Sequence, residues 1–400
     1  MNPTATLKRA LSLPSDLTGP SRAQTVVVMW QRFGPYHLAR LRGAAATLAP
    51  EWRVVGLEVA ERDNYRWSRA SDAEVERVVL FPGCEYQSLS PRSVRRRTQD
   101  VLNTLQPSAV CVNGWAAVEA VSALKWCRAN QRQAVVMSET FESAPNPLKT
   151  VVRRWRVRQF NAALVGGRLH ARYLESLGYP SHKIAVGYDV IDSEHFARPV
   201  RSVAGRFAGL VAKRYFFANT RFLPRKGIDA LLKAYARYRA MDAIRPDRPV
   251  NDRPWHLVIS GSGEMEMPWK KLAESLGVTT TVHWPGFIQY HDLPCWYRAA
   301  GVFVHPARQE AWGLVVNEAI ASNLPVIVGR RVGAACELVR EGENGFLVDP
   351  DDIESFAALL HRVAQLTDTQ RESMGKASRR IVSQFGPDRF GQALKRCLQE

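Results

Sequence analysis

Residues 301–328, GVFVHPARQEAWGLVVNEAIASNLPVIV, are the most informative part of this chain about its fold. Two short apolar runs at its ends are typical of buried strands, and residues 314–321 between them have the apolar spacing of a helix. A strand, a loop and a helix in this order place the helix N-terminus at the carboxyl edge of a parallel sheet. Backbone N–H groups and the helix dipole favour an anion there, so we expect a phosphate to lie against Gly313 and Leu314, with Val315 beside them.

Two glutamates of this stretch, Glu310 and Glu318, are candidate ligands for the rest of such a molecule. The neighbours of Glu318 in the predicted helix are almost all apolar, so its carboxylate needs a partner. Two carboxylate oxygens can accept both hydroxyl groups of a ribose, and Glu310, in the preceding loop, is placed to face a sugar bound to the same phosphates. The alternative is a helix-start acid that merely complements the helix dipole.

The upstream segment ANTRFLPRKGIDALLKAY, residues 218–235, contains two candidate cations. An apolar run ends at Arg221, a turn with Lys226 and Gly227 follows, and a helix with one apolar side begins after it. Arg221 and Lys226 therefore both lie just after the end of the same predicted strand. Two fixed cations there can neutralise a diphosphate leaving group without a metal. The alternative is a solvated basic turn.

Two further strand ends follow. Residues 255–263, WHLVISGSG, predict a strand and a turn with Gly261 and Gly263, which permit close approach of the backbone to a ligand or serve only the geometry of the turn. In VHWPGFI, the backbone beside Phe287 and Ile288 is a candidate to contact a nucleotide base.

Taken in order, these features, with LPVIV and ENGFLV after them, resemble the donor-binding domain of glycosyltransferase family 4, retaining enzymes of GT-B fold. The resemblance is strong over residues 187–350 and looser from residue 26 onward. It implies that Arg221 and Lys226 bind the diphosphate, that Glu310 faces the donor sugar, and that Glu318 binds the ribose. It also implies an α/β chain of two Rossmann-like αβα domains that face each other across a cleft.

One departure from the family pattern lies before LPVIV, where the usual small residue and glycine are Ser322 and Asn323. Asparagine is the residue other than glycine that best tolerates a left-handed backbone, so we expect the turn to be preserved.

Length and composition agree with two folded domains, because 400 residues exceed one typical core and the 46% apolar and 23% charged content is near the globular average. The segment ARPVRSVAGRFAG after Phe196, residues 197–209, predicts the linker between them. We expect a mobile extension over residues 1–22, an acceptor-side domain over 23–200 and a nucleotide-sugar-binding domain over 201–384. In similar enzymes a last helix, here 385–400, returns to the first domain.

Six scattered cysteines without metal-ligand spacing favour reduced thiols, and no run of eighteen apolar residues occurs, so we expect a cytoplasmic protein without a signal peptide or membrane span. Asp349 and Asp351 have the Asp-x-Asp spacing of a metal site in another glycosyltransferase fold. They precede a predicted helix, where Asp residues serve as N-caps, so we expect neither a metal nor a cofactor.

The formal net charge of +17 predicts phosphates, nucleic acid or an anionic membrane as partners. One basic cluster covers residues 92–97, and another lies in residues 148–160, LKTVVRRWRVRQF, with apolar residues at helical spacing. Such a helix, Leu148 to Phe160, either lies on a bilayer at the inner face of the membrane or packs its apolar side on its own domain.

The first half predicts a second αβ layer with strands at residues 24–30, 53–59, 108–113 and 133–138. Right-handed crossovers would give a parallel sheet whose carboxyl edge exposes Gly34 with His37, Asn113 with Trp115, and Glu139.

These edge residues are the candidates for the acceptor or sugar side. Many enzymes of the resembled family have a histidine that contacts the sugar where this chain has Asn113 and Trp115. Trp115 either stacks on a pyranose ring or is a buried aromatic. Glu139 either orients the acceptor hydroxyl or caps a helix, and His37 is interpreted as structural.

The sequence thus predicts a metal-independent hexosyltransferase that uses a UDP- or GDP-linked sugar and a saccharide or lipid-linked acceptor, as in polysaccharide or glycolipid synthesis. The resemblance to the family implies that it is a retaining enzyme. A nucleotide-sugar epimerase or a glycan phosphorylase of the same fold is the alternative. A basic nonenzymatic nucleic-acid-binding protein is more remote, because it leaves Glu318 unexplained.

Overall fold

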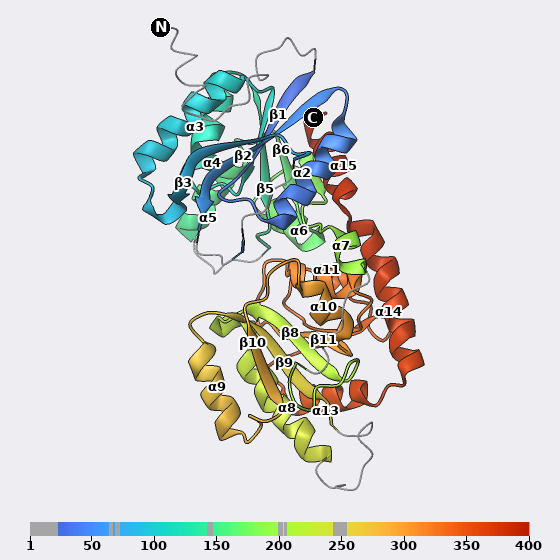
Figure 1. Cartoon of the computed structure of the whole chain (residues 1–400). Coiled ribbons are helices and arrows are strands. Elements are labelled where there is room, and N and C mark those ends of the chain that lie inside the picture. Colours follow the sequence, from blue (N-terminus) through green and yellow to red (C-terminus); the bar gives the residue numbers. More distant parts are fainter. Residues whose placement is uncertain are drawn as a thin grey trace. The chain divides into compact units, whose positions relative to one another are not determined.

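The computed structural model describes residues 23–399 apart from 64–66, 69–72, 142–146, 199–202, 204–205 and 243–253. The chain divides into unit 1, residues 1–191 with 385–400, and unit 2, residues 192–384 (Figure 1). The division between the halves thus lies at 191/192, before the position expected from the sequence. The expected extension over residues 1–22 lies outside the described residues.

Unit 1 contains a parallel sheet in the order β3-β2-β1-β4-β5-β6-β7. Its strands are β1 (Gln24–Trp30), β2 (Trp52–Arg62), β3 (Arg77–Glu85), β4 (Ala109–Asn113), β5 (Gln133–Ser138), β6 (Ala162–Val165) and β7 (Ile184–Val186). The central strands are buried on both faces, which explains their continuous apolar runs.

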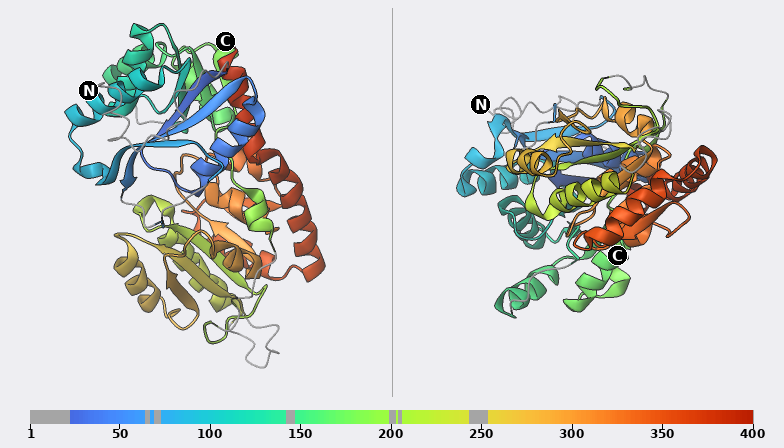
Figure 2. Two further views of the ribbon diagram at one scale, coloured as in Figure 1. Left: turned by 45° about the horizontal axis from the view of Figure 1, so that its top comes forward. Right: turned by 90° about the horizontal axis from the view of Figure 1, so that it is seen from below.

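Helices cover both faces of this sheet (Figure 2). One face packs against α2 (Pro35–Leu48) and α15 (Pro387–Leu398), and the other against α3 (Pro91–Leu105), α4 (Val118–Ala129), the end of α5 (Pro147–Val157) and α6 (Arg168–Ser176). Glycines let α2 and α15 approach closely, since a Cβ on Gly43 would lie 2.0 Å from the Pro387 carbonyl oxygen.

Unit 2 contains a second parallel sheet in the order β10-β9-β8-β11-β12-β13. Its strands are β8 (Tyr215–Arg221), β9 (His256–Ser262), β10 (Val282–Gly286), β11 (Val302–His305), β12 (Val326–Gly329) and β13 (Gly345–Val348). β8 and β11 are adjacent, so their carboxyl ends meet at the centre of one sheet edge.

The helices of unit 2 are α7 (Ser193–Ala197), α8 (Ile228–Asp242), α9 (Glu266–Ser275), α10 (Leu293–Ala299), α11 (Leu314–Ala321), α12 (Ala335–Leu338), α13 (Ile353–Ala364) and α14 (Asp368–Val382). Apolar residues of α8, α9 and α13 share one core with alternate residues of β8 and β9. On the opposite face, Tyr297 of α10 packs edge-on against Phe217, with ring centroids 5.0 Å apart.

The strands predicted from the sequence are present, and α11 has the predicted bounds. β3, β6 and β7 were not predicted. Asn323 has a φ of 60°, so the turn before β12 is left-handed as expected. No helix among the described residues is both long and apolar enough to cross a membrane.

Candidate functional site

The candidate site lies at the carboxyl edge of the unit 2 sheet, where the sequence motifs converge. β8 ends at Arg221, β11 ends at His305, and α11 begins after Gly313. Gly313 has a φ of 98°, a left-handed conformation that favours glycine. The first N–H groups of α11 therefore lie at this edge, directly after a tight turn, as the sequence predicts.

Lys226 lies in a short turn, η3 (Pro224–Lys226), that is packed tightly against the loop after β11. Gly227 ends the turn with a φ of 67°, and a Cβ on it would lie 2.1 Å from the Pro306 carbonyl oxygen. This packing buries the Lys226 side chain and places its Nζ in an ion pair with Glu310 Oε2.

The direct contact between Lys226 and Glu310 differs from the sequence-based expectation, which gave each side chain a separate ligand. Burial, together with the positive charges of Arg225 and Arg221, lowers the pKa of Lys226 to about 7. The adjacent Glu310 carboxylate opposes this shift, because it stabilises the ammonium. Arg221 therefore contributes positive charge to the same place as Lys226.

His305 is a further member of this cluster. Its Nε2 lies 3.8 Å from Glu310 Oε2, and its ring is 2% exposed. Burial, and then the positive charge of Lys226, lowers the pKa of His305 well below its usual value, so the ring is neutral. Both Lys226 and His305 thus point at the same oxygen of Glu310.

The loop that carries Glu310 is held from both sides. The Glu310 N–H donates to the Arg331 carbonyl at 3.3 Å, and the Gly333 N–H donates to the Glu310 carbonyl at 3.0 Å. Trp312, almost fully buried, donates its Nε1–H to Asn317 Oδ1 at 2.8 Å and anchors the loop on α11. The Glu310 carboxylate therefore projects from a fixed backbone.

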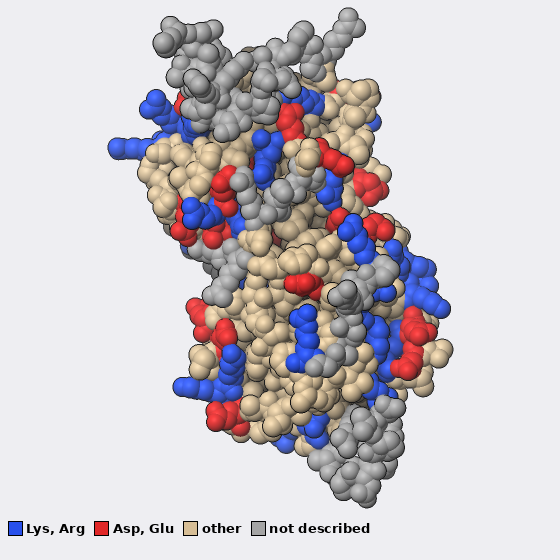
Figure 3. All heavy atoms as spheres, in the orientation of Figure 1, with Lys and Arg blue, Asp and Glu red and all other residues tan. Residues whose placement is uncertain are grey.

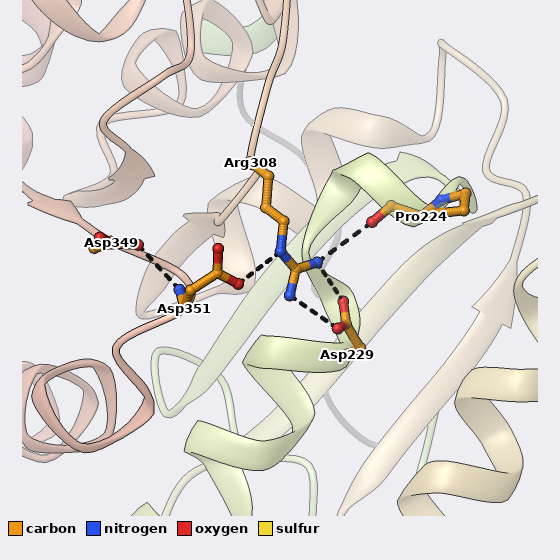
Figure 4. Close-up of polar contacts among 5 residues, drawn as sticks. All are labelled: Pro224, Asp229, Arg308, Asp349 and Asp351. Carbon is orange, nitrogen blue, oxygen red and sulfur yellow. Dashed lines mark hydrogen bonds and ion pairs between the residues drawn. The ribbon is translucent and has the colours of Figure 1, made fainter.

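Arg308 ties this loop to the turn that carries Lys226 (Figure 4). Its guanidinium donates to both carboxylate oxygens of Asp229, at 2.8 and 2.9 Å, and to Asp351 Oδ1 at 2.7 Å. Its backbone N–H donates to the Arg225 carbonyl at 2.9 Å. The planar guanidinium group suits this bidentate geometry, so Arg308 holds the two loops in a fixed relative position.

The Asp-x-Asp triplet is also explained by this arrangement. Asp351 pairs with Arg308, Asp349 Oδ1 accepts from the Asp351 N–H at 3.1 Å, and Asp352 caps α13. The predicted capping role thus belongs to Asp352 and not to the triplet itself.

We expect Arg308→Lys to lower turnover about tenfold or more, because lysine keeps the charge but loses the fork that aligns the loops of Lys226 and Glu310. Arg237→Lys is the matched control, since Arg237 pairs with Glu354 at 3.2 Å while both side chains are about two-thirds exposed. Steady-state turnover of the two purified variants checks this, and equal turnover in both would contradict it.

Glu318 is fully buried and has the partner that its apolar surroundings require. The Tyr297 hydroxyl donates to Glu318 Oε2 at 2.6 Å. Burial and the nearby Glu318 carboxylate raise the pKa of Tyr297 well above its usual value, as expected for a phenol that donates to a carboxylate. Asn219 of β8 joins the network, because its amide lies 3.3 Å from the Tyr297 hydroxyl.

Gly261 and Gly263 lie against the end of β8. A Cβ on Gly261 would lie 1.8 Å from the Thr220 carbonyl oxygen, and one on Gly263 would lie 2.6 Å from that of Phe222. The glycines are therefore required by the packing of the chain itself. The predicted approach of this turn to a ligand stays a prediction.

Phe287 and Ile288 follow β10 at the same sheet edge, as the sequence predicts. Ile288 is buried and Phe287 is half-buried. Their proposed contact with a nucleotide base stays a prediction.

The candidate acceptor residues lie at the carboxyl ends of three adjacent strands of unit 1. Gly34 precedes α2, and its N–H donates to His37 Nδ1 at 2.9 Å, so His37 caps the helix as a structural residue. Asn113 ends β4, and its Oδ1 accepts from the Tyr188 hydroxyl at 3.4 Å. Trp115 is half-buried against the unit 1 core, and its carbonyl accepts from Arg156 at 3.2 Å.

Glu139 follows β5 and lies in a charged cluster. Its neighbour Asp189 is 1% exposed and accepts a hydrogen bond from Arg40 Nη2 at 2.9 Å. Burial, and then the Glu139 carboxylate, raises the pKa of Asp189 well above its usual value. Glu139 therefore lies beside a buried carboxyl group at the sheet edge. Its predicted contact with an acceptor hydroxyl stays a prediction.

Within the described part of the chain, no group of three or more His, Cys, Asp and Glu side chains is arranged to hold a metal ion. The cysteines are free, and Cys111, Cys127 and Cys397 are buried.

Sequence reasoning missed three residues of the site: Tyr297, His305 and Arg308. His305 directly follows a predicted strand, which is a signal that it lies at the edge. Tyr297 and Arg308 have no local signal, because their partners Glu318 and Asp229 are distant in sequence.

Comparisons with known proteins show what the segment that carries this site is similar to. Residues 210–381 match the family described as Glycosyl transferases group 1. The chain is 37% identical over 161 residues to D-inositol 3-phosphate glycosyltransferase of Thermobifida fusca, covering 38% of this chain and 34% of that protein. It is 33% identical over 190 residues to a GDP-mannose-dependent monoacylated alpha-(1-6)-phosphatidylinositol monomannoside mannosyltransferase of Corynebacterium glutamicum, covering 45% and 46%. The chain thus spans less than half the length of these two relatives.

Solved structures extend the comparison to the whole fold. Anabaena HepE, solved in complex with UDP and glucose, superposes with a TM-score of 0.70 at 18% identity over 94% of this chain and 99% of HepE. This confirms the expected α/β architecture with two Rossmann-like domains. The chain therefore has the GT-B fold, and its residues 210–381 match the family of group 1 glycosyl transferases.

Proposed function

We propose that the protein is a retaining, metal-independent glycosyltransferase that moves a hexose from a nucleotide diphosphate sugar to a saccharide or a lipid-linked saccharide. The observation that carries this proposal is the cluster of Lys226, Glu310 and Arg221 at the sheet edge from which α11 begins. This cluster lies inside the segment that matches the family.

In the proposed reaction, the diphosphate of the donor lies against Lys226, Arg221 and the first N–H groups of α11. These groups stabilise the negative charge that grows on the leaving group, and they need no reorganisation because the loops that carry them are fixed. Glu310 faces the hexose, and Glu318 accepts hydrogen bonds from the ribose. We propose retention of the anomeric configuration of the hexose because the sequence resembles a family of retaining enzymes.

The names of relatives support the donor and acceptor classes. HepE was solved with UDP and glucose, and the Corynebacterium relative is named for GDP-mannose and a phosphatidylinositol mannoside. We propose that Gly34, Asn113, Trp115 and Glu139 of unit 1 contact the acceptor.

A panel of nucleotides tests the proposed donor site. We expect UDP or GDP to raise the melting temperature, since a ligand at 100 times its dissociation constant stabilises the folded state by about 2.7 kcal/mol. Consumption of the corresponding sugar nucleotide should then require an acceptor, which separates a transferase from an epimerase. If no nucleoside diphosphate raises the melting temperature, the proposed function is wrong.

We further propose that α5 holds the protein on an anionic membrane surface at its cytoplasmic face. Four of the six exposed large hydrophobic side chains among the described residues lie in this helix: Leu148 (81% exposed), Val151 (65%), Val152 (50%) and Trp155 (63%). Val157 and Phe160 are buried instead, so only the end of the segment joins its own core.

Basic side chains lie along the same helix, at Lys149, Arg153, Arg154, Arg156 and, just after it, Arg158. Each contributes about 1 kcal/mol near an anionic surface, and exposed apolar side chains add insertion into the interface. On the face of the molecule in Figure 3, by contrast, Lys and Arg are interspersed with Asp and Glu. α5 therefore carries basic side chains and exposed apolar side chains together. This combination suits a bilayer surface better than a nucleic acid.

Vesicle binding can distinguish membrane attachment through α5 from attachment through the overall positive charge of the protein. We expect Trp155→Ser with Leu148→Ser, and separately Arg154→Glu with Arg158→Glu, to lower binding to vesicles that contain anionic lipid at least tenfold. Arg95→Glu with Arg96→Glu on α3 makes the same charge change at two exposed positions and should have a smaller effect. Equal binding to neutral and anionic vesicles by the wild-type protein would contradict the proposal.

A further inference from the structure

His305 is buried at the end of β11, and the chemistry proposed above gives it no role. Its Nε2 is buried and has no hydrogen-bond partner in the described part of the chain. A buried ring nitrogen without a partner is unfavourable, because it has lost its hydrogen bonds to water, so such a group points to a state in which the partner is supplied.

The nearest acceptor for this nitrogen is Glu310 Oε2, at 3.8 Å. That distance is too long for a hydrogen bond, and the same oxygen is held by the Lys226 ammonium. Lys226 and His305 are therefore two alternative donors to one carboxylate oxygen.

A bound diphosphate changes this competition. Its negative charge attracts the Lys226 ammonium, which then shares its charge between phosphate and Glu310. The buried Oε2 of Glu310, from which the ammonium is partly drawn away, then needs another donor, and the neutral His305 ring can donate from Nε2.

Gly313 lies beside both side chains. A Cβ built on Gly313 would lie 3.4 Å from Glu310 Cγ and 3.6 Å from His305 Nε2, which are ordinary contact distances, so both side chains border this residue. A move of roughly 1 Å by Glu310 Oε2 would shorten its distance of 3.8 Å from His305 Nε2 to that of a charge-assisted hydrogen bond.

We propose that His305 is a positioning residue that takes over the hydrogen bond to Glu310 when the donor diphosphate draws Lys226 toward itself. Glu310 is thereby held toward the hexose during transfer. This inference rests on the proposed function and assigns no bond-making step to His305.

Two substitutions of His305 test the inference. His305→Leu removes the donor, whereas His305→Gln keeps an amide N–H near the position of Nε2. We expect His305→Leu to lower kcat about tenfold with little change in the Kd of free UDP or GDP, and His305→Gln to recover most of the loss. Equal kcat in His305→Leu and wild type, or an equal loss in both variants, would overturn the inference.

A measurement on the unsubstituted protein covers the case in which a variant does not fold. We expect the Nε2–H proton of His305 to move downfield in NMR spectra when UDP or GDP is added, because it enters a hydrogen bond to a carboxylate. Ring resonances that stay unchanged in the bound protein would overturn the inference. A wild-type protein that binds neither nucleotide and transfers no sugar would instead reject the proposed function.

Discussion

Replacement of Lys226 by alanine is expected to lower turnover ~10²-fold or more, because it removes a preorganised positive charge from the place where the leaving group gains negative charge. Lys226 is 7% exposed and held by a packed turn, so its charge is in position before the donor arrives. Initial rates of sugar transfer at saturating donor and acceptor measure the effect.

The control for this variant is Lys233→Ala, which removes an exposed lysine on α8, the helix that follows the same turn. It should leave turnover near that of the wild type, since a solvated charge outside the site contributes little. Lys226→Ala also leaves the Glu310 carboxylate without its ion pair, so thermal unfolding must show that the variant is folded. A folded Lys226→Ala protein with near-normal turnover would refute the diphosphate site.

The second large effect is expected at Glu318. Glutamine there preserves the volume and an oxygen that can accept from Tyr297, but it removes the charge offered to the ribose hydroxyls. Hydrogen bonds to charged groups contribute about 1.5–3 kcal/mol, so we expect KM for the nucleotide sugar to rise roughly 10- to 100-fold. Steady-state kinetics with varied donor concentration measure this change.

A donor that lacks the ribose 2′-hydroxyl shows whether Glu318 binds the ribose or only contributes to internal packing. If Glu318 binds the ribose, the deoxy donor should be much weaker than the natural one in the wild type and only slightly weaker in Glu318→Gln, because the coupled interaction is already lost. Tyr297→Phe is the control that removes the partner of Glu318 while leaving the carboxylate, and it should keep the discrimination between donors. The same discrimination in Glu318→Gln as in the wild type would contradict the ribose assignment.

Much of the fold could be predicted, because the strongest signals in the chain are local. β1, β5 and α11 have the bounds predicted from their apolar runs and spacing, and the glycine and asparagine turns at Gly313 and Asn323 adopt left-handed backbones. β3 could not be recognised, since Pro82 and Gly83 interrupt it, and it forms at a sheet edge beside β2. β6 and β7 have only four and three residues, too few for periodicity to identify them.

The α/β class, the order of the motifs and the residues at the unit 2 sheet edge could all be predicted from local sequence patterns. These follow from hydrophobic period and turn chemistry, which act over a few neighbouring residues. Which side chains meet became known from the folded chain alone: Lys226 contacts Glu310, Tyr297 contacts Glu318, and Arg308 contacts Asp229 and Asp351. Such partners are distant in the chain, and their contact depends on strand order and close packing, which no local pattern records.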